Sequence, residues 1–220
     1  MKLTKPQPVH PATGTSSPIP QPNHQSVLLL VDLQNDFFPG GALGVQDAHS
    51  LLPLINAYIR LFSTQGLTIM ATRDWHPSTH CSFQEHGGSW PAHCVQGSKG
   101  AQFHSQLVMP PGTMVISKGT LAHKDAYSGF DGTSLEDRLE DAGVHTLFVL
   151  GLATDYCVKL TVLDARARTY QVVILEDATR GVNRHPQDST KALEEMAAAG
   201  AIRARAEDLG IHPNWLQGRV

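Results

Sequence analysis

The sequence predicts an α/β fold in which a mainly parallel sheet is packed between helices in three layers. Short apolar runs rich in valine and leucine alternate along the chain with amphipathic segments of helical period, a pattern typical of parallel sheets. The 220 residues are enough for one large domain with a continuous core, which is the default for this length.

The elements follow one another in a regular order. The first expected strand covers 26–34, whose sequence SVLLLVDLQ is typical of a strand buried on both faces. A helix is expected over 48–66, where apolar residues recur at helical spacing and Gly66 supplies a stop signal. Further strands are expected at 67–74, 112–118, 145–152, 170–177 and 201–205. Further helices are expected at 134–143, 155–169 and 188–200.

The composition points to a small-molecule partner. A net charge of −3, a pI near 6.4 and 17% charged residues provide no basic surface for nucleic acid or for a lipid membrane. Three cysteines are an odd number, so at least one cannot form an internal disulfide, and reduced thiols suit a cytoplasmic protein. No segment approaches the roughly eighteen apolar residues of a spanning helix.

The N-terminal segment differs from the rest of the chain. Residues 1–25 are rich in proline, serine, threonine and glutamine, and they lack the apolar run of a signal peptide. We therefore expect residues 1–25 to form a disordered or loosely draped tail and residues 26–220 to form the domain.

Two stretches interrupt the tight alternation of strands and helices. Residues 75–111 and 119–132 are long and rich in glycine, proline, histidine and aromatics. Loops of this length in a compact domain are usually functional or disordered. The aromatic residues at positions 75, 83, 90 and 103 argue against disorder in the first stretch.

Reactive residue types occur where the expected strands end. Ligands of open parallel sheets bind beyond the carboxyl ends of the strands, where the loops converge. Asp32, Asp74 and Lys118 end the first three strands, and Cys157 follows the fourth. Each has an ordinary alternative explanation: a carboxylate bound by loop amides, a solvated lysine, or a cysteine that packs as a small hydrophobe.

Asp32, Lys118 and Cys157 together suggest a nucleophilic triad. Cys157 is expected about three residues into a helix capped by Thr154, where the helix dipole lowers the pKa of a thiol. The carboxylate would accept the thiol proton, the cation would hold the carboxylate, and the thiol would attack.

The segment 72–94 carries an unusual number of metal-binding residue types. Asp74 and His76 can face one point from an extended backbone, and His93 would complete the set, which suits Zn²⁺, Fe²⁺ or Mn²⁺ in an open site. His80 could add a fourth ligand. A closed Cys₂His₂ zinc site from His80, Cys81, His93 and Cys94 is the alternative, but its spacing is not that of a zinc finger and it leaves Asp74 without a role.

Five blocks of the sequence resemble one known family. The blocks are VDLQNDFFPGGAL, TRDWHPSTHCSF, SWPAHCVQGSKGAQFH, ISKGT and GLATDYCVKLTVLDA. In order and spacing they resemble the nicotinamidases of the isochorismatase-like cysteine hydrolase superfamily, over residues 26–205. The resemblance implies a six-stranded parallel sheet and hydrolysis of nicotinamide to nicotinate and ammonia through a thioester on Cys157, with pyrazinamide as a candidate second substrate.

The resemblance also implies roles for individual residues. The triad falls on Asp32, Lys118 and Cys157; the ligands of one divalent metal ion, zinc before iron or manganese, fall on Asp74, His76 and His93; the walls around the pyridine ring fall on Phe37, Trp90 and Tyr127; and the oxyanion hole falls on the amides of Ala153 and Cys157. An unusual cis peptide is implied between Ala153 and Thr154. His80 corresponds to a histidine that binds metal in only some members.

Two departures from the family pattern concern the tail and the pocket. The tail before residue 26 is extra, and the segment between Lys118 and Tyr127 is slightly longer, which affects the expected substrate range more than the chemistry. The chain offers edges that could support a homo-oligomer.

Other functions fit the residues less well. A related amidase acting on a carbamoyl or ureido compound would use the same triad, but such substrates offer no pyridine nitrogen to a metal. Isochorismate hydrolases of the superfamily do not use the cysteine. A redox module would need a second cysteine close to Cys157, typically as Cys-x-x-Cys, and none is there. A binding module would not explain why three reactive groups follow converging strands.

Overall fold

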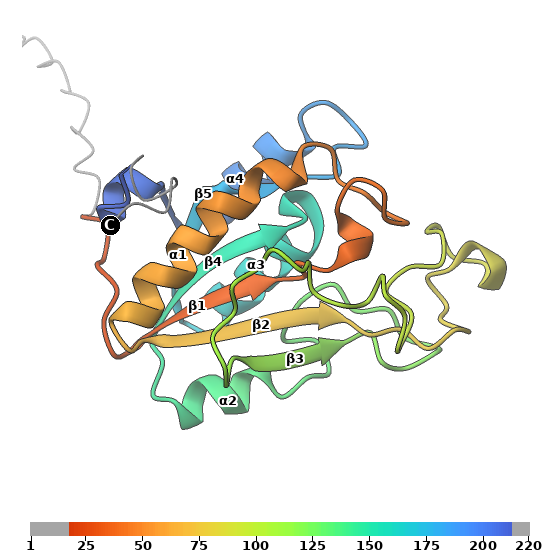
Figure 1. The fold of residues 1–220 in the computed structure, drawn as a ribbon, viewed down its shortest axis with the longest axis horizontal. Helices are drawn as coiled ribbons and strands as arrows, with labels where there is room; N and C mark the ends of the chain where they lie inside the picture. The colour runs from red at the N-terminus through yellow and green to blue at the C-terminus, as the bar shows by residue number, and fades with distance from the viewer. Residues whose placement is uncertain (1–17, 213–220) are drawn as a thin grey trace, which may run out of the picture.

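The computed structural model describes residues 18–212, within which six strands form one sheet (Figure 1). The strand order is β3-β2-β1-β4-β5-β6, and every neighbouring pair runs parallel. The strands are β1 (Ser26–Val31), β2 (Thr68–Asp74), β3 (Met114–Lys118), β4 (Thr146–Leu152), β5 (Gln171–Arg180) and β6 (Ile202–Ala204). The predicted fold class is confirmed, and the sheet is wholly parallel rather than mainly so.

Helices connect these strands close to the predicted positions. The α-helices are α1 (Leu52–Thr64), α2 (Leu135–Asp141), α3 (Lys159–Ala167) and α4 (Asp188–Ala198). The short helical turns are η1 (Asn35–Phe37), η2 (Ala48–Leu51), η3 (Gln84–His86), η4 (Thr154–Val158) and η5 (Ala206–Leu209). Gly66 ends the first helical segment as expected, because its φ of +66° lets the amide of Leu67 donate to the carbonyl of Phe62.

The sheet is buried on both faces because successive residues of each strand point to opposite sides. In β1, Leu28 and Leu30 belong to the core beneath α1, whereas Val27, Leu29 and Val31 belong to the core beneath α2, α3 and α4. This arrangement explains why the strand sequence is apolar at every position rather than at alternate ones.

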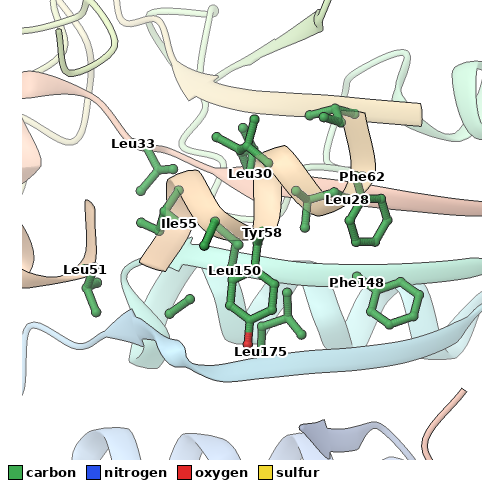
Figure 2. Close-up of a cluster of buried hydrophobic side chains, with 14 of the residues drawn as sticks. Leu28, Leu30, Leu33, Leu51, Ile55, Tyr58, Phe62, Phe148, Leu150 and Leu175 are labelled. Atoms are coloured by element: carbon green, nitrogen blue, oxygen red, sulfur yellow. The ribbon is translucent and has the colours of Figure 1, made fainter. Parts of the chain in front are cut away.

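The core beneath α1 contains most of the large buried side chains (Figure 2). Ile55, Tyr58 and Phe62 point from α1 onto the sheet, and the ring of Phe62 meets that of Phe148 edge-on at a centroid distance of 5.4 Å. Each such side chain contributes about 1.5–3 kcal/mol when fully buried. The hydroxyl of Tyr58 is satisfied by donating to the carboxylate of Asp177 at 2.9 Å.

Long loops leave the sheet on the side to which the strand arrows point (Figure 1). One loop joins β2 to β3 and the other joins β3 to α2, so both predicted interruptions lie at the carboxyl edge of the sheet. The first loop is packed rather than extended, since Phe83 is fully buried and Trp90 is 8% exposed.

Part of the predicted tail lies against the domain. Residues 18–25 contain no helix or strand, yet Ile19 packs on the core and the side-chain amide of Gln21 donates to the carbonyl of Asp208. Residues 1–17 lie outside the described part of the chain, so the domain boundary stays a prediction. No helix within residues 18–212 is long and apolar enough to cross a membrane.

Candidate active site

The strand order places the four predicted strand-end residues beside one another. Asp74 and Lys118 are register partners in β2 and β3. The amide of Asp32 donates to the carbonyl of Thr72, which places the end of β1 next to β2. Strand β4 pairs with the other side of β1 and leads into η4, which contains Cys157. Four segments that are distant in sequence therefore meet at one edge.

Lys118 lies at the centre of this group, and its side chain is fully buried. Its ammonium pairs with the carboxylate of Asp74, lies 2.9 Å from Oδ2 of Asp32, and is 3.4 Å from Sγ of Cys157. Burial alone would lower the pKa of Lys118, but Asp32 and Asp74 raise it well above its ordinary value. Lys118 is therefore a permanent cation that holds two carboxylates, only one of which was expected from the sequence.

The two oxygens of Asp32 differ in their hydrogen bonding. Oδ1 accepts a hydrogen bond of 2.6 Å from the hydroxyl of Thr72. Oδ2 is paired with Lys118 by charge but has no hydrogen-bond donor among residues 18–212. Burial raises the pKa of Asp32 despite the nearby ammonium. A buried carboxylate whose Oδ2 is held by the charge of Lys118 alone is well suited to accept a proton.

The prediction that the helix start lowers the pKa of Cys157 is wrong in direction. Burial, together with the nearby carboxylates of Asp32 and Asp74, raises the pKa of this thiol well above its ordinary value, although Lys118 acts in the opposite sense. The sequence could not reveal this, because the effect comes from desolvation by segments distant along the chain. At neutral pH the residue is a thiol that needs a base.

The turn that carries Cys157 also differs from expectation. Thr154 lies inside η4 rather than capping it, and Ala153 precedes the turn. The carbonyl of Ala153 accepts hydrogen bonds from the amides of Tyr156 and Val158, so this residue closes the first turn. The cis peptide joins Leu152 to Ala153, one bond earlier than predicted. It therefore lies at the end of β4 and not within the turn that follows.

Asp74, His76 and His93 form a compact set of metal-binding groups. One ligand atom from each lies within 4.8 Å of the others, and all three residues are buried. The Nδ1 atoms of His76 and His93 each lie 2.8 Å from a backbone carbonyl, of Gly119 and Pro91 respectively. A carbonyl can only accept, so Nδ1 carries a hydrogen, and in the neutral imidazole Nε2 keeps a free lone pair. This donor set fits a divalent transition metal.

The ionisation of Asp74 and His93 supports the same conclusion. Burial by itself raises the pKa of Asp74, but Lys118 and His76 lower it below the usual value, so the group is a carboxylate. Burial lowers the pKa of His93, which keeps that imidazole neutral and able to bind a metal. Burial lowers the pKa of His76, but the hydrogen bond and charge of Asp74 raise it above the ordinary value, so this imidazole must give up a proton when a metal binds.

His80 is not available to the set in this arrangement. Its ring stacks on that of His76 at 4.1 Å, but its Nδ1 interacts with the hydroxyl of Ser82 and its Nε2 with the carbonyl of Lys124. Among residues 18–212, the alternative group of His80, Cys81, His93 and Cys94 does not assemble. The described residues therefore favour the open three-residue set.

A pocket of about 290 Å³ opens between the metal-binding groups and Cys157. All three predicted ring-binding residues line it, namely Phe37, Trp90 and Tyr127. The indole nitrogen of Trp90 donates to the hydroxyl of Tyr127 at 2.9 Å, which fixes both rings. Tyr156 adds a further aromatic wall 5.2 Å from Trp90 and was missed, although its position beside Cys157 was a usable signal.

Two supporting polar residues were also missed by sequence reasoning. Thr72 binds Asp32, as described above, and the buried Gln34 accepts from the amide of Asp74 while donating to its carbonyl. Both contacts join residues 40 positions apart, so no local sequence pattern could indicate them.

Comparison with known proteins agrees with this geometry. The family model of the isochorismatase domain matches residues 26–208. The chain belongs to the isochorismatase family. It is accordingly a hydrolase on the isochorismatase-like α/β fold.

Relatives within the isochorismatase family cover most of the chain. Nicotinamidase of Escherichia coli is 45% identical over 195 residues, which are 79% of this chain and 92% of that protein. The structure of Pyrococcus horikoshii pyrazinamidase in complex with zinc is 45% identical with a TM-score of 0.79, covering 82% of this chain and 99% of that one. The structure of PnC1 from L. infantum in complex with nicotinate is 38% identical with a TM-score of 0.80, and the match covers 86% of this chain and 96% of that one.

Proposed function

We propose that this chain hydrolyses nicotinamide to nicotinate and ammonia. The observation that carries the proposal is a single aromatic pocket with a buried thiol beside a carboxylate–ammonium pair and a metal-binding set of one carboxylate and two imidazoles. The identity to nicotinamidases and to a nicotinate-bound structure supports the choice of substrate.

The pocket has the groups that a pyridine carboxamide requires. Phe37, Trp90, Tyr127 and Tyr156 offer flat apolar surfaces to the ring. Asp74, His76 and His93 would hold one divalent ion, with zinc first because the P. horikoshii structure contains it. When bound, that ion would supply a Lewis-acidic point for the pyridine nitrogen.

The reaction begins with Asp32 and Cys157. Oδ2 of Asp32 accepts the thiol proton, and the sulfur attacks the amide carbon to form a tetrahedral oxyanion. The amides of Ala153 and Cys157 are proposed to stabilise this oxyanion, each by about 2.7–4 kcal/mol. Asp32 returns the proton to the nitrogen, ammonia leaves, and a thioester remains on Cys157.

Hydrolysis of the thioester completes the cycle. Asp32 accepts a proton from water, the resulting hydroxide equivalent attacks the thioester carbon, and the sulfur leaves as the proton returns to Cys157. Lys118 stays charged throughout and holds Asp32 in place.

The direct test is ammonia release from nicotinamide by purified, zinc-loaded protein. We expect turnover with nicotinamide well above that with carbamoyl and ureido compounds, because only the pyridine ring suits both the aromatic walls and the metal-binding set. Folded, metal-loaded protein that released ammonia only from a carbamoyl or ureido compound would replace this proposal with the related amidase.

The same pocket is proposed to accept pyrazinamide, which keeps a ring nitrogen meta to the carboxamide. A cytoplasmic location and a homo-oligomeric state stay predictions.

Thr72 provides a second test, because it binds the proposed base but does not line the pocket. Replacing Thr72 by valine removes the hydroxyl that donates to Asp32 while keeping the shape. We expect kcat/KM to fall about tenfold or more, since hydrogen bonds to charged groups contribute about 1.5–3 kcal/mol. That hydrogen bond lowers the pKa of Asp32, so its loss raises the pKa and should move the acid limb of the kcat/KM profile to higher pH.

Thr72→Ser is the matched control, because it keeps the hydroxyl. The pH profile of Thr72→Ser should resemble that of the natural protein. An acid limb at the same pH in Thr72→Val and Thr72→Ser would show that this hydroxyl does not tune the base.

A further inference from the structure

The loop that follows β5 forms one side of the pocket. Val182 of this loop (residues 181–187) lines the pocket, and the guanidinium of Arg184 covers the ring of Trp90 at 4.1 Å from the centroid. Trp90 is itself a pocket wall. The position of the loop therefore affects two walls at once.

A buried carboxylate holds this loop. Oδ1 of Asp155 accepts from the amide of Val182 at 2.9 Å, and Oδ2 accepts from the amide of Asn183 at 2.8 Å. Asp155 is 8% exposed and pairs with no cation among residues 18–212, so these amides are its main polar partners. Asn183 has φ +51°, and such a left-handed residue helps successive amides face one anion.

Asp155 also belongs to the turn that carries the proposed nucleophile. It lies in η4 two residues before Cys157, and Tyr156 between them lines the pocket. The far side of the loop is tied to α4, because Oδ1 of Asn183 accepts from the amide and the hydroxyl of Ser189. The loop is thus held between the nucleophile turn and α4.

We propose that Asp155 is a positioning residue that fixes loop 181–187 against the Cys157 turn and thereby sets the size of substrate that the pocket admits. The substrate class in this inference rests on the proposed function. Asp155 does not line the pocket, so it acts through Val182 and through the Arg184 contact with Trp90. Releasing the loop should widen the pocket without removing the nucleophile, base or metal-binding groups.

The kinetic test replaces Asp155 by asparagine, whose side-chain nitrogen cannot accept a hydrogen bond from one of the two loop amides. We expect the KM for nicotinamide to rise about fivefold or more with a smaller change in kcat. In a panel of nicotinamides methylated at each free ring carbon in turn, at least one should gain about threefold in kcat/KM relative to nicotinamide. Unchanged KM and unchanged relative kcat/KM, whatever happens to kcat, would overturn the proposal.

A second readout does not depend on the substrate. The rates at which iodoacetamide and its bulkier N-phenyl derivative alkylate Cys157 are measured by mass spectrometry, and their ratio reports steric access because the chemistry is the same. In Asp155→Asn, the rate of alkylation by the bulky reagent should rise relative to the rate with the small one. An unchanged ratio would count against the inference even if nicotinamide proved not to be the substrate, so the two failures can be told apart.

Matched variants keep the test decisive. Asp177→Asn is the control, because Asp177 also accepts from a backbone amide, that of Ala206 at the start of η5 at 2.8 Å, but does not line the pocket. Its kinetic and alkylation ratios should match the natural protein. If Asp155→Asn does not fold, Gly181→Ala acts on the same contact, because a Cβ there would lie 2.9 Å from Oδ1 of Asp155 and against the hydroxyl of Ser189. The same shifts are expected, and their absence would again overturn the proposal.

Discussion

Replacing Cys157 by alanine is expected to reduce ammonia release from nicotinamide by a factor of about 10⁴ or more, to the level of background hydrolysis. The sulfur of Cys157 lies 3.4 Å from the ammonium of Lys118 and within 4.8 Å of a carboxylate oxygen of Asp32, and the proposed thioester cannot form without it. The measurement is a coupled ammonia assay on folded, zinc-loaded protein, together with the intact mass during turnover. The natural protein should show a transient nicotinoyl adduct and the alanine variant none.

Cys81→Ala is the control for this experiment. Cys81 is a free, partly buried thiol that does not line the pocket, so its removal should leave both turnover and adduct unchanged. Substantial activity in Cys157→Ala would mean that the thiol packs as a small hydrophobe and that an activated water attacks the amide carbon directly.

Loss of the metal-binding set is expected to have a similarly large effect. His93→Ala should reduce bound zinc from about one ion per chain to near zero. The protein supplies only three ligands to the proposed site, so the loss of one imidazole removes a large share of the binding free energy. Nicotinamide hydrolysis should fall with it. Treatment of the natural protein with a chelator should abolish activity, and zinc, iron or manganese should restore it. Metal content is measured by elemental analysis, independently of activity.

His80→Ala separates the metal-binding set from its surroundings. Both ring nitrogens of His80 are occupied by Ser82 and Lys124, so this variant should keep its zinc even if it is less stable. Equal loss of zinc from His80→Ala and His93→Ala would show that His80 turns toward the ion and acts as a fourth ligand.

The elements of the fold follow from local sequence, because each depends on a pattern that a short segment contains. The apolar run of β1 begins where predicted but ends at Val31 rather than at residue 34, and the glycine that ends the first helical segment lies where predicted. The meeting of Asp32, Asp74, Lys118 and Cys157 was also predictable, because the carboxyl ends of neighbouring parallel strands share one edge.

Other features of the site depend on contacts between distant segments. Thr72 and Gln34 each bind across 40 positions, and the sequence contains no pattern that marks such pairs. The cis peptide was predicted one bond too late, because the strand-to-turn boundary is fixed by hydrogen bonds at Ala153 rather than by residue type.

The sequence by itself determined the order of the elements and the residue types that reach the site, because period, glycine position and strand ends are local properties. Only the tertiary structure decided the protonation of these groups. Burial raises the pKa of Cys157, Lys118 holds two carboxylates instead of one, and backbone carbonyls orient His76 and His93. Desolvation and charge pairing depend on distance in space, and that distance is set by the packing of the whole chain.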